Sequence, residues 1–206
     1  MLPQIVLVRH GETPWSTEGR HTGHSDLPLT EAGAEEALGL PARLGSFVPD
    51  QVFTSPLLRA RDTARLAGFP QAEEDPDLME WHYGTLEGLT LAEIHQQMPG
   101  WSVFQNGSPR GESVDQVIER AGRVVARLRE LEGRTLLFLH GHISRVIAAR
   151  WCGLPLEICP HLMLNTAAVS VLGYDRRRTM PAILSWNIRG ALVLSPQVEV
   201  NVDEEG

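Results

Sequence analysis

The stretch Ile5-Val6-Leu7-Val8-Arg9-His10-Gly11 decides the fold, because four consecutive apolar residues run directly into an arginine, a histidine and a glycine. An unbroken apolar run of this kind is typical of a strand that is buried on both faces of a largely parallel sheet. A second apolar run, Thr135-Leu136-Leu137-Phe138-Leu139, ends in the same way at His140-Gly141. Because ligands of such sheets bind beyond the carboxyl ends of the strands, His10 and His140 are expected at one end of one sheet.

Helices and strands are predicted to alternate along the remaining chain. A first helix is expected over 30–37, with an interruption at Pro41, and a second helix after Ser55-Pro56. Two more helices are expected over 114–128 and 143–151, and further strands over 51–54, 167–174 and 182–188. This order favours a single α/β domain over 1–206, folded as a three-layer α/β/α sandwich around a mostly parallel sheet. The segment 75–111, with one short helix near 91–98, is expected to be an insertion over the active-site mouth, and 201–206 a frayed tail.

The composition excludes several classes of function. The formal net charge of −8 and the pI near 5.5 argue against nucleic acid or an anionic membrane as a partner. All 18 basic residues are arginines, so Schiff-base and P-loop chemistry, which need a lysine, are not available. Cys152 and Cys159 are too few for a disulfide scaffold and lack the spacing of a zinc site. Because the sequence lacks a basic leader and a long apolar run, a soluble, cytoplasmic protein is expected.

Two arginines near the predicted strand ends suit a phosphate ligand. Arg9 precedes His10, and Arg59 lies in the helix that follows Ser55-Pro56. Their guanidinium groups could clamp one phosphate bidentately, and the amino end of that helix would add partial positive charge. The transition state of phosphoryl transfer spreads negative charge over the equatorial oxygens, so fixed cations are the main requirement. A neutral imidazole in line with the leaving oxygen can then attack phosphorus.

Three motifs, in order along the chain, resemble one known family. Leu7-Val8-Arg9-His10-Gly11-Glu12-Thr13 resembles the signature of the histidine phosphatase superfamily, also called the phosphoglycerate mutase-like family. Thr54-Ser55-Pro56-Leu57-Leu58-Arg59-Ala60 is similar to its second-arginine segment, and Leu139-His140-Gly141-His142 to its second-histidine segment. The resemblance implies that His10 is the nucleophile and forms a phosphohistidine, without a metal or a cofactor. The pocket for the transferring group would be formed by Arg9, Arg59 and His140.

A fourth segment, Met79-Glu80-Trp81-His82-Tyr83-Gly84, matches the family's segment for the general acid, which the resemblance assigns to Glu80. Apolar neighbours and a nearby phosphate dianion are expected to favour its protonated carboxyl, and the same residue could then activate water to hydrolyse the phosphohistidine. The family frequently has asparagine where this chain has Ser16, and a bound water could take the place of the missing amide. The predicted substrate-binding residues are Ser16, Thr22, Gly23, Trp81, Gly141 and His142.

These residues predict a metal-independent phosphomonoester hydrolase that acts on small phosphorylated metabolites. The segment 15–29 and the Glu80-Trp81 pair resemble the sugar-phosphate phosphatase branch that includes sedoheptulose bisphosphatases, and bacterial acid phosphatases look similar. One alternative is phosphoglycerate mutase, although the family's mutases carry arginine and lysine where this chain has Trp81 and Leu91. The other is a non-catalytic domain that binds phosphorylated ligands on the same fold. The expected partner is a small phosphomonoester, and a homodimer is left open.

Overall fold

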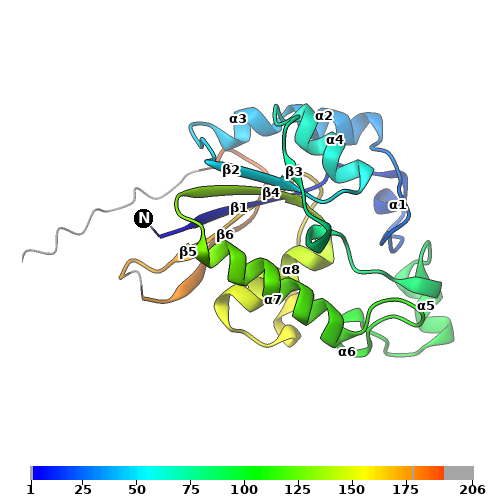
Figure 1. Cartoon of the computed structure of the whole chain (residues 1–206). Coiled ribbons are helices and arrows are strands. Elements are labelled where there is room, and N and C mark those ends of the chain that lie inside the picture. The colour runs from blue at the N-terminus through cyan, green and yellow to red at the C-terminus, as the bar shows by residue number, and fades with distance from the viewer. Residues whose placement is uncertain (1, 178, 193–206) are drawn as a thin grey trace, which may run out of the picture.

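Among the residues that the structure describes, six strands form one mixed sheet at the centre of the protein (Figure 1). The computed structural model describes residues 2–177 and 179–192, so the predicted tail over 201–206 lies outside the described residues. The strands are β1 (Gln4–Arg9), β2 (Gln51–Thr54), β3 (Glu73–Glu74), β4 (Arg134–Leu139), β5 (Val169–Tyr174) and β6 (Pro181–Ile188). Their order across the sheet is β3-β2-β4-β1-β5-β6. Strands β1 to β4 are parallel, β5 is antiparallel to β1, and β6 is antiparallel to β5.

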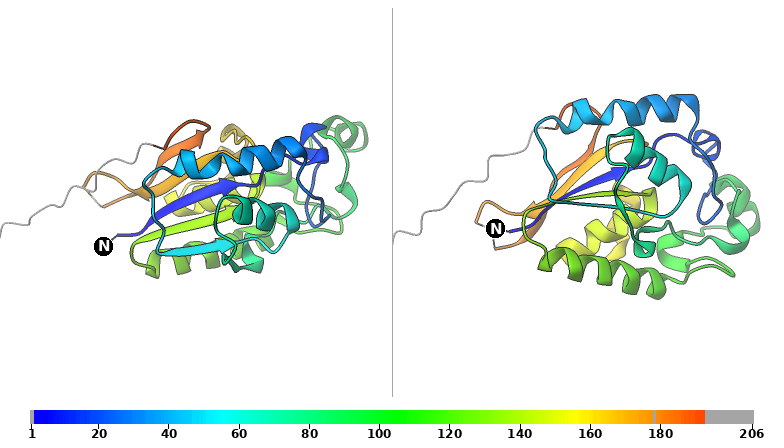
Figure 2. Two further views of the ribbon diagram at one scale, coloured as in Figure 1. Left: turned by 90° about the horizontal axis from the view of Figure 1, so that it is seen from above. Right: turned by 45° about the horizontal axis from the view of Figure 1, so that its top comes forward.

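Helices cover both faces of the sheet (Figure 2). One face is covered by α2 (Glu31–Leu38), α3 (Leu40–Leu44) and α4 (Leu58–Leu66), and the other by α7 (Val114–Glu130) and α8 (Gly141–Cys152). Alternate side chains of β1 enter the two cores: Val6 and Val8 lie on the α2 side, whereas Ile5 and Leu7 lie on the α7 side. The strand is therefore buried on both faces, and the predicted three-layer α/β/α sandwich with a mostly parallel sheet is confirmed.

Two helices near the strand ends begin at residues other than those predicted. Helix α4 has Leu57 rather than Ser55 as its N-cap. The reason is that the Ser55 N–H donates to the carbonyl of Phe138 at 2.9 Å, so the chain follows β4 for one more residue before it turns. The Ser55 hydroxyl accepts instead from the Leu57 N–H at 3.3 Å. Helix α8 begins at Gly141, directly after His140, which is earlier than predicted.

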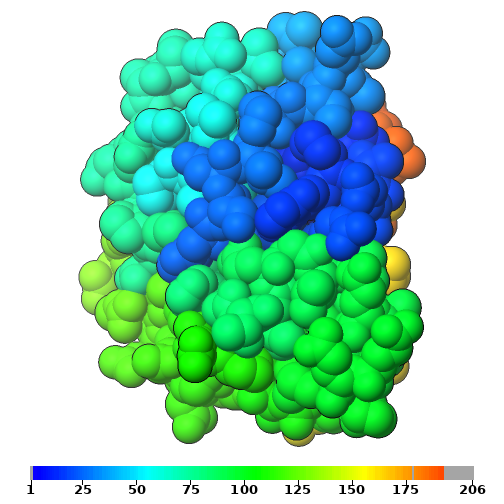
Figure 3. Space-filling model, turned by 90° about the vertical axis from the view of Figure 1, so that its right-hand side faces the viewer, coloured from blue at the N-terminus to red at the C-terminus, as the bar shows by residue number. Residues whose placement is uncertain are grey.

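The segment 75–111 consists mainly of short turns and helices that cover the carboxyl end of the sheet. It contains η1 (Pro76–Leu78), η2 (Gly84–Leu86), α5 (Leu91–Gln97) and α6 (Val103–Asn106), of which α5 was predicted. The chain after β1, with α1 (Pro14–Thr17), lies against this segment in Figure 3. Arg20 forms a β-bridge with Thr90, and the His21 N–H donates to the Leu89 carbonyl at 2.9 Å.

The remaining turn, η3 (Leu156–His161), connects α8 with β5. The run Arg176-Arg177-Arg178 falls between β5 and β6 in the sequence, and its third residue lies outside the described residues. None of the described helices is long and apolar enough to cross a membrane.

Candidate active site

The two predicted histidines lie side by side at the carboxyl end of the sheet. His10 follows β1 and His140 follows β4, and the parallel register of these strands pairs Arg9 with Leu139. The two imidazole rings have centroids 5.1 Å apart and planes inclined by 53°. The prediction that His10 and His140 lie at one end of one sheet is therefore confirmed.

The surroundings of His10 define which of its ring nitrogens can react. Its Nδ1 atom lies 2.7 Å from the Gly11 carbonyl oxygen, which can only accept, so Nδ1 carries the proton and Nε2 carries a free lone pair. Burial, followed by the positive charges of Arg59 and Arg9, lowers the pKa of His10 well below its usual value. The ring is therefore neutral near pH 7, as a nucleophile requires.

His140 has both ring nitrogens bound within the protein. The Nε of Arg59 donates to Nδ1 at 3.1 Å, so the proton of the neutral ring is on Nε2, which lies 2.8 Å from the Ser55 hydroxyl. Burial, then the charge of Arg59 and the neighbouring His10, lowers the pKa of His140 well below its usual value. In this arrangement His140 does not line the pocket beside His10.

Arg59 also departs from its predicted place. Its side chain is fully buried, and its Nη1 and Nη2 atoms donate to the carbonyls of residues 22, 23 and 25 at 2.8 to 3.1 Å. The predicted clamp of Arg9 and Arg59 on one phosphate is therefore absent among the described residues, because loop carbonyls occupy Arg59. The amino end of α4 is occupied too, since the Leu58 N–H donates to the Asp26 carboxylate at 2.7 Å.

The loop 22–25 is held between two charged side chains. Arg59 binds its carbonyls, and the carboxylate of Glu87 accepts from the main-chain N–H groups of Gly23 and His24 at 3.1 and 2.9 Å. Glu87 also accepts from the Ser25 hydroxyl at 2.8 Å. Arg59 therefore holds the carbonyls of this loop, and Glu87 of the segment 75–111 holds its N–H groups.

Arg9, by contrast, is available to an anion. It donates to the Leu164 carbonyl through Nη1 at 2.6 Å, but its buried Nε has no hydrogen-bond partner among the described residues. A buried N–H without a partner is costly, and a bound anion would satisfy it. Arg9 lines the same pocket as His10.

Glu80 is buried at the amino end of α8. Its carboxylate accepts from the main-chain N–H groups of His142 at 2.8 Å, Ile143 at 2.9 Å and Trp81 at 2.9 Å. Burial alone would raise its pKa, but hydrogen bonds and charge from His142 hold that pKa well below its usual value. Without a bound phosphate, the N–H donors of Trp81, His142 and Ile143 therefore favour the carboxylate of Glu80, and its protonation beside a phosphate dianion stays a prediction.

The pocket at this end of the sheet has a volume of about 170 Å³. It is lined by seven of the predicted site residues: Arg9, His10, Ser16, Thr22, Glu80, Gly141 and His142. The hydroxyl of Ser16 is already used, because it donates to the Thr13 carbonyl at 2.9 Å and accepts from the Thr13 N–H at 2.8 Å. Four predicted residues do not line it: Arg59, His140, Gly23 and Trp81.

Trp81 and Gly23 have structural partners instead of a place in the pocket. The Trp81 side chain is fully buried, packs edge-on against Phe104, and donates its indole N–H to the Glu112 carbonyl at 3.0 Å. The N–H of Gly23 is bound to Glu87 and its carbonyl to Arg59. Neither residue lines the pocket, so their predicted substrate-binding role is not supported.

The pocket is also lined by residues that were not predicted from the sequence: Gly19, Arg20, His21, Tyr83 and Arg145. Arg145 is on α8, and its buried Nε has no hydrogen-bond partner among the described residues. Its spacing of three and four residues from His142 and Gly141 on one helix is the signal that could have identified it. The Tyr83 hydroxyl lies 2.6 Å from His142 Nδ1, and burial, then Glu80, raises the pKa of Tyr83 well above its usual value.

Within residues 2–177 and 179–192, no group of three or more His, Cys, Asp or Glu side chains is arranged to hold a metal ion.

Comparisons with known proteins agree on one family. The model of the histidine phosphatase superfamily (branch 1) matches residues 5–189. An acid phosphatase of Mycobacterium tuberculosis is 41% identical over 185 residues, covering 88% of this chain and 91% of the relative. A sedoheptulose 1,7-bisphosphatase of Saccharomyces cerevisiae is 36% identical over 195 residues, covering 76% of this chain and 70% of the relative.

The fold is likewise shared with a solved structure. An open reading frame product of Mycobacterium tuberculosis superposes with a TM-score of 0.85 at 38% identity, covering 90% of this chain and 97% of that chain. Since the family model spans nearly the whole described chain and the paired histidines meet at the end of its sheet, the chain belongs to the histidine phosphatase superfamily, branch 1.

Proposed function

We propose that the protein is a phosphomonoester hydrolase that passes the phosphoryl group through the Nε2 atom of His10. The observation that carries this proposal is the tautomer of that ring, because the bond from Nδ1 to the Gly11 carbonyl leaves the Nε2 lone pair free on a side chain that lines the pocket. Arg9 and the carboxylate of Glu80 line the same pocket. A nucleophile, a cation and a proton-transfer group thus adjoin one cavity.

In the first step Nε2 of His10 attacks phosphorus, and the bond to the leaving oxygen breaks with its electron pair on that oxygen. The leaving oxygen takes a proton from Glu80, which has received it from the monoanionic form of the bound phosphomonoester. This route follows from the depressed pKa of Glu80, which leaves the free protein without that proton. The products are the free alcohol and a phosphohistidine.

In the second step the ionised Glu80 accepts a proton from water, and the water oxygen attacks the phosphorus of the phosphohistidine. The P–N bond breaks, its electron pair returns to Nε2 of His10, and inorganic phosphate leaves. Three main-chain N–H groups already stabilise the carboxylate of Glu80, so the base is in its reactive form.

Arginines supply the positive charge in this mechanism, and no metal is assigned to it. Arg9 binds the transferring group through the N–H that has no partner among the described residues. Arg59 acts from behind: it orients His140 through Nδ1, and its charge contributes, after burial, to keeping His10 neutral.

The lining of the pocket supports a polar metabolite as the substrate. Arg145 and the His142–Tyr83 pair offer polar groups beside Glu80, so a leaving group with hydroxyl or acid oxygens would find partners there. A sugar phosphate carries such oxygens, and one relative is named for a sugar bisphosphate. A cytoplasmic location stays a prediction of the sequence, which leaves the oligomeric state open.

Phosphoglycerate mutase is less well supported. The residue after the acid, an arginine in those mutases, is here Trp81, whose side chain is fully buried. It cannot help to hold the acid end of a phosphoglycerate while the phosphoryl group is returned.

The proposal is tested by assaying phosphate release from a panel of sugar phosphates, phosphoglycerates and p-nitrophenyl phosphate, with and without a chelator. His10→Ala should abolish turnover and remove an acid-labile radiolabel from the protein, whereas His161→Ala, an exposed histidine of η3, should retain both. Turnover by His10→Ala at the parent rate would overturn the proposed nucleophile. Loss of activity in the chelator would overturn metal independence, and faster interconversion of phosphoglycerates than hydrolysis would favour the mutase.

A further inference from the structure

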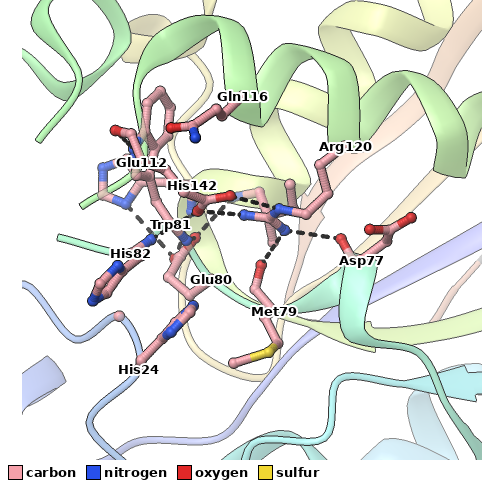
Figure 4. A network of polar contacts seen from close by, with 12 residues as sticks. His24, Asp77, Met79, Glu80, Trp81, His82, Glu112, Gln116, Arg120 and His142 are labelled. Carbon is pink, nitrogen blue, oxygen red and sulfur yellow. Dashed lines mark hydrogen bonds and ion pairs between the residues drawn. The ribbon is translucent and has the colours of Figure 1, made fainter. Parts of the chain in front are cut away.

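Arg120 of α7 is buried behind the segment that carries Glu80. Its Nε and Nη2 atoms donate to the two carboxylate oxygens of Glu112 at 2.9 and 2.8 Å. Its Nη1 donates to the main-chain carbonyls of Asp77 at 2.9 Å and Met79 at 2.7 Å. Figure 4 shows the guanidinium between the Glu112 carboxylate and the backbone that leads to Glu80. Arginine is rarely buried without such partners. All the partners of Arg120 belong either to the segment 77–79, which leads to Glu80, or to the carboxylate of Glu112.

Glu112 holds the chain on the other side of Glu80. Its carboxylate oxygen Oε2 also accepts from the His82 N–H at 2.9 Å, and its own N–H donates to the His82 carbonyl at 2.9 Å. Its main-chain carbonyl accepts the indole N–H of Trp81 at 3.0 Å. The Arg120–Glu112 ion pair therefore binds the backbone of Met79, directly before Glu80, and of His82, two residues after it.

The packing between these segments leaves no space for a shift. A Cβ added to Gly111 would lie 2.0 Å from the His82 carbonyl oxygen. Gly84 has a φ of +54°, and a Cβ there would lie 2.2 Å from the Pro109 carbonyl oxygen. The main chain of 109–111 thus packs directly against the main chain of 82–84, just after Glu80.

The ion pair does not line the pocket, and a buried ion pair is weak evidence for stability, because desolvation offsets much of its attraction. Its contacts are better explained by what they hold in place. We propose that the Arg120–Glu112 ion pair positions the carboxyl group of Glu80 for proton transfer to the leaving oxygen. This inference rests on the proposed function, in which Glu80 is the proton donor, and it makes Arg120 a positioning residue.

The expected effect depends on the leaving group. A positioned general acid accelerates departure of a poor leaving group by about 10²- to 10⁴-fold, and displacement of a catalytic group by about 1 Å can cost about 10²-fold. An alkoxide needs the proton to leave, whereas p-nitrophenolate leaves without it. Displacing Glu80 should therefore slow the hydrolysis of alkyl phosphates and largely spare p-nitrophenyl phosphate.

The test compares kcat/KM for an alkyl phosphate and for p-nitrophenyl phosphate in Arg120→Met and in the parent protein. This constant reports the steps up to cleavage of the P–O bond, so hydrolysis of the phosphohistidine does not enter it. We expect kcat/KM to fall about 10²-fold for the alkyl phosphate and by less than about fivefold for p-nitrophenyl phosphate. Glu112→Gln, which keeps the shape of the side chain, provides a second variant and should shift the ratio in the same direction.

The matched control is Arg123→Gln, on the same helix. Arg123 is exposed and binds the Asp77 carboxylate, so it contacts the same segment without touching the backbone on either side of Glu80. It should leave the ratio of the two constants unchanged. Equal losses for both substrates in folded Arg120→Met and Glu112→Gln would overturn the inference and indicate a purely structural ion pair.

Glu80→Gln separates this inference from the proposed function. If Glu80→Gln slows the alkyl phosphate selectively and the ion-pair variants do not, the positioning role is wrong and the proton donor stands. If Glu80→Gln itself shows no selectivity for the leaving group, the assignment of Glu80 as proton donor is wrong, and the positioning proposal is overturned with it.

Discussion

Raising the pH above about 6 should slow hydrolysis of an alkyl phosphate in proportion to the loss of the substrate's monoanion. Although burial would raise the pKa of Glu80, hydrogen bonds and charge from His142 hold it well below its usual value. The free protein therefore carries an ionised Glu80, and the proton needed by the leaving alkoxide enters with the phosphate, whose second pKa is about 6.

The size of this effect follows from the titration of the substrate. Each pH unit above its second pKa removes about nine-tenths of the monoanion, so kcat/KM should fall about tenfold per unit, which corresponds to about 1.4 kcal/mol. Between pH 6, where about half of the substrate is monoanion, and pH 8 the loss is about 50-fold. On the acid side the profile should stay level until His10 protonates, because burial and the charges of Arg59 and Arg9 hold the pKa of that ring well below its usual value.

The assay is kcat/KM from pH 4 to 9, measured with two alkyl phosphates that differ in their second pKa. The break in each profile should move with the pKa of the substrate, and the profile of p-nitrophenyl phosphate should be flatter, because its leaving group needs no proton. A break at the same pH for both alkyl phosphates would assign it to a group of the protein. In that case Glu80 would hold its own proton in the free state, and the reasoning from its N–H donors would be refuted.

Three further predictions concern binding and stability. Arg145→Met should raise KM for a sugar phosphate about tenfold, as expected for loss of a charged hydrogen bond. KM for p-nitrophenyl phosphate should change less than about twofold. Equal increases for both substrates would show that Arg145 does not recognise the leaving group. Urea unfolding should show lower stability at pH 5 than at pH 7, because the pKa values of buried His10 and His140 lie below that of an unfolded histidine. For each ring, the free energy of unfolding should fall by about 1.4 kcal/mol per pH unit below 6.5 until that ring protonates. Equal stability at the two pH values would contradict neutral buried rings. Gly84→Ala should destabilise the protein by more than about 2 kcal/mol and Gly153→Ala by about 1 kcal/mol. Both glycines have a positive φ, but only Gly84 lacks space for a Cβ. Equal urea midpoints for the two variants would show that the backbone around Gly84 moves to make that space.

Much of the fold could be predicted because local patterns and tertiary structure agree at the strand ends. The apolar runs before His10 and His140 need burial on both faces, and only a parallel pair brings both histidines to one edge. The start of α4 could not be predicted in the same way. Ser55-Pro56 is a good helix start by sequence, but the bond from the Ser55 N–H to Phe138 is a contact with another strand.

The limits of the site prediction have the same origin. Glu80 was correctly placed in the pocket, but its protonation state depends on N–H donors of α8, which lie some 60 residues further along the chain. Trp81 was predicted to bind the substrate, but it is buried, and its indole N–H donates to the carbonyl of Glu112, which lies some 30 residues further along the chain. Arg59 was expected to face an anion because nothing local indicates that loop carbonyls would occupy it.

The loop 22–25, which is held by Arg59 and Glu87, limits how the substrate specificity of this protein can be changed. Exchange of the segment 75–111 with that of a relative would remove the Glu87 carboxylate unless the donor chain supplies an anion at the same point. The N–H groups of the loop would then lose their acceptor, although the buried Arg59 would still donate to its carbonyls. A segment transferred to this protein to change its specificity therefore has to supply a carboxylate at the position of Glu87 as well as the residues that contact the new substrate.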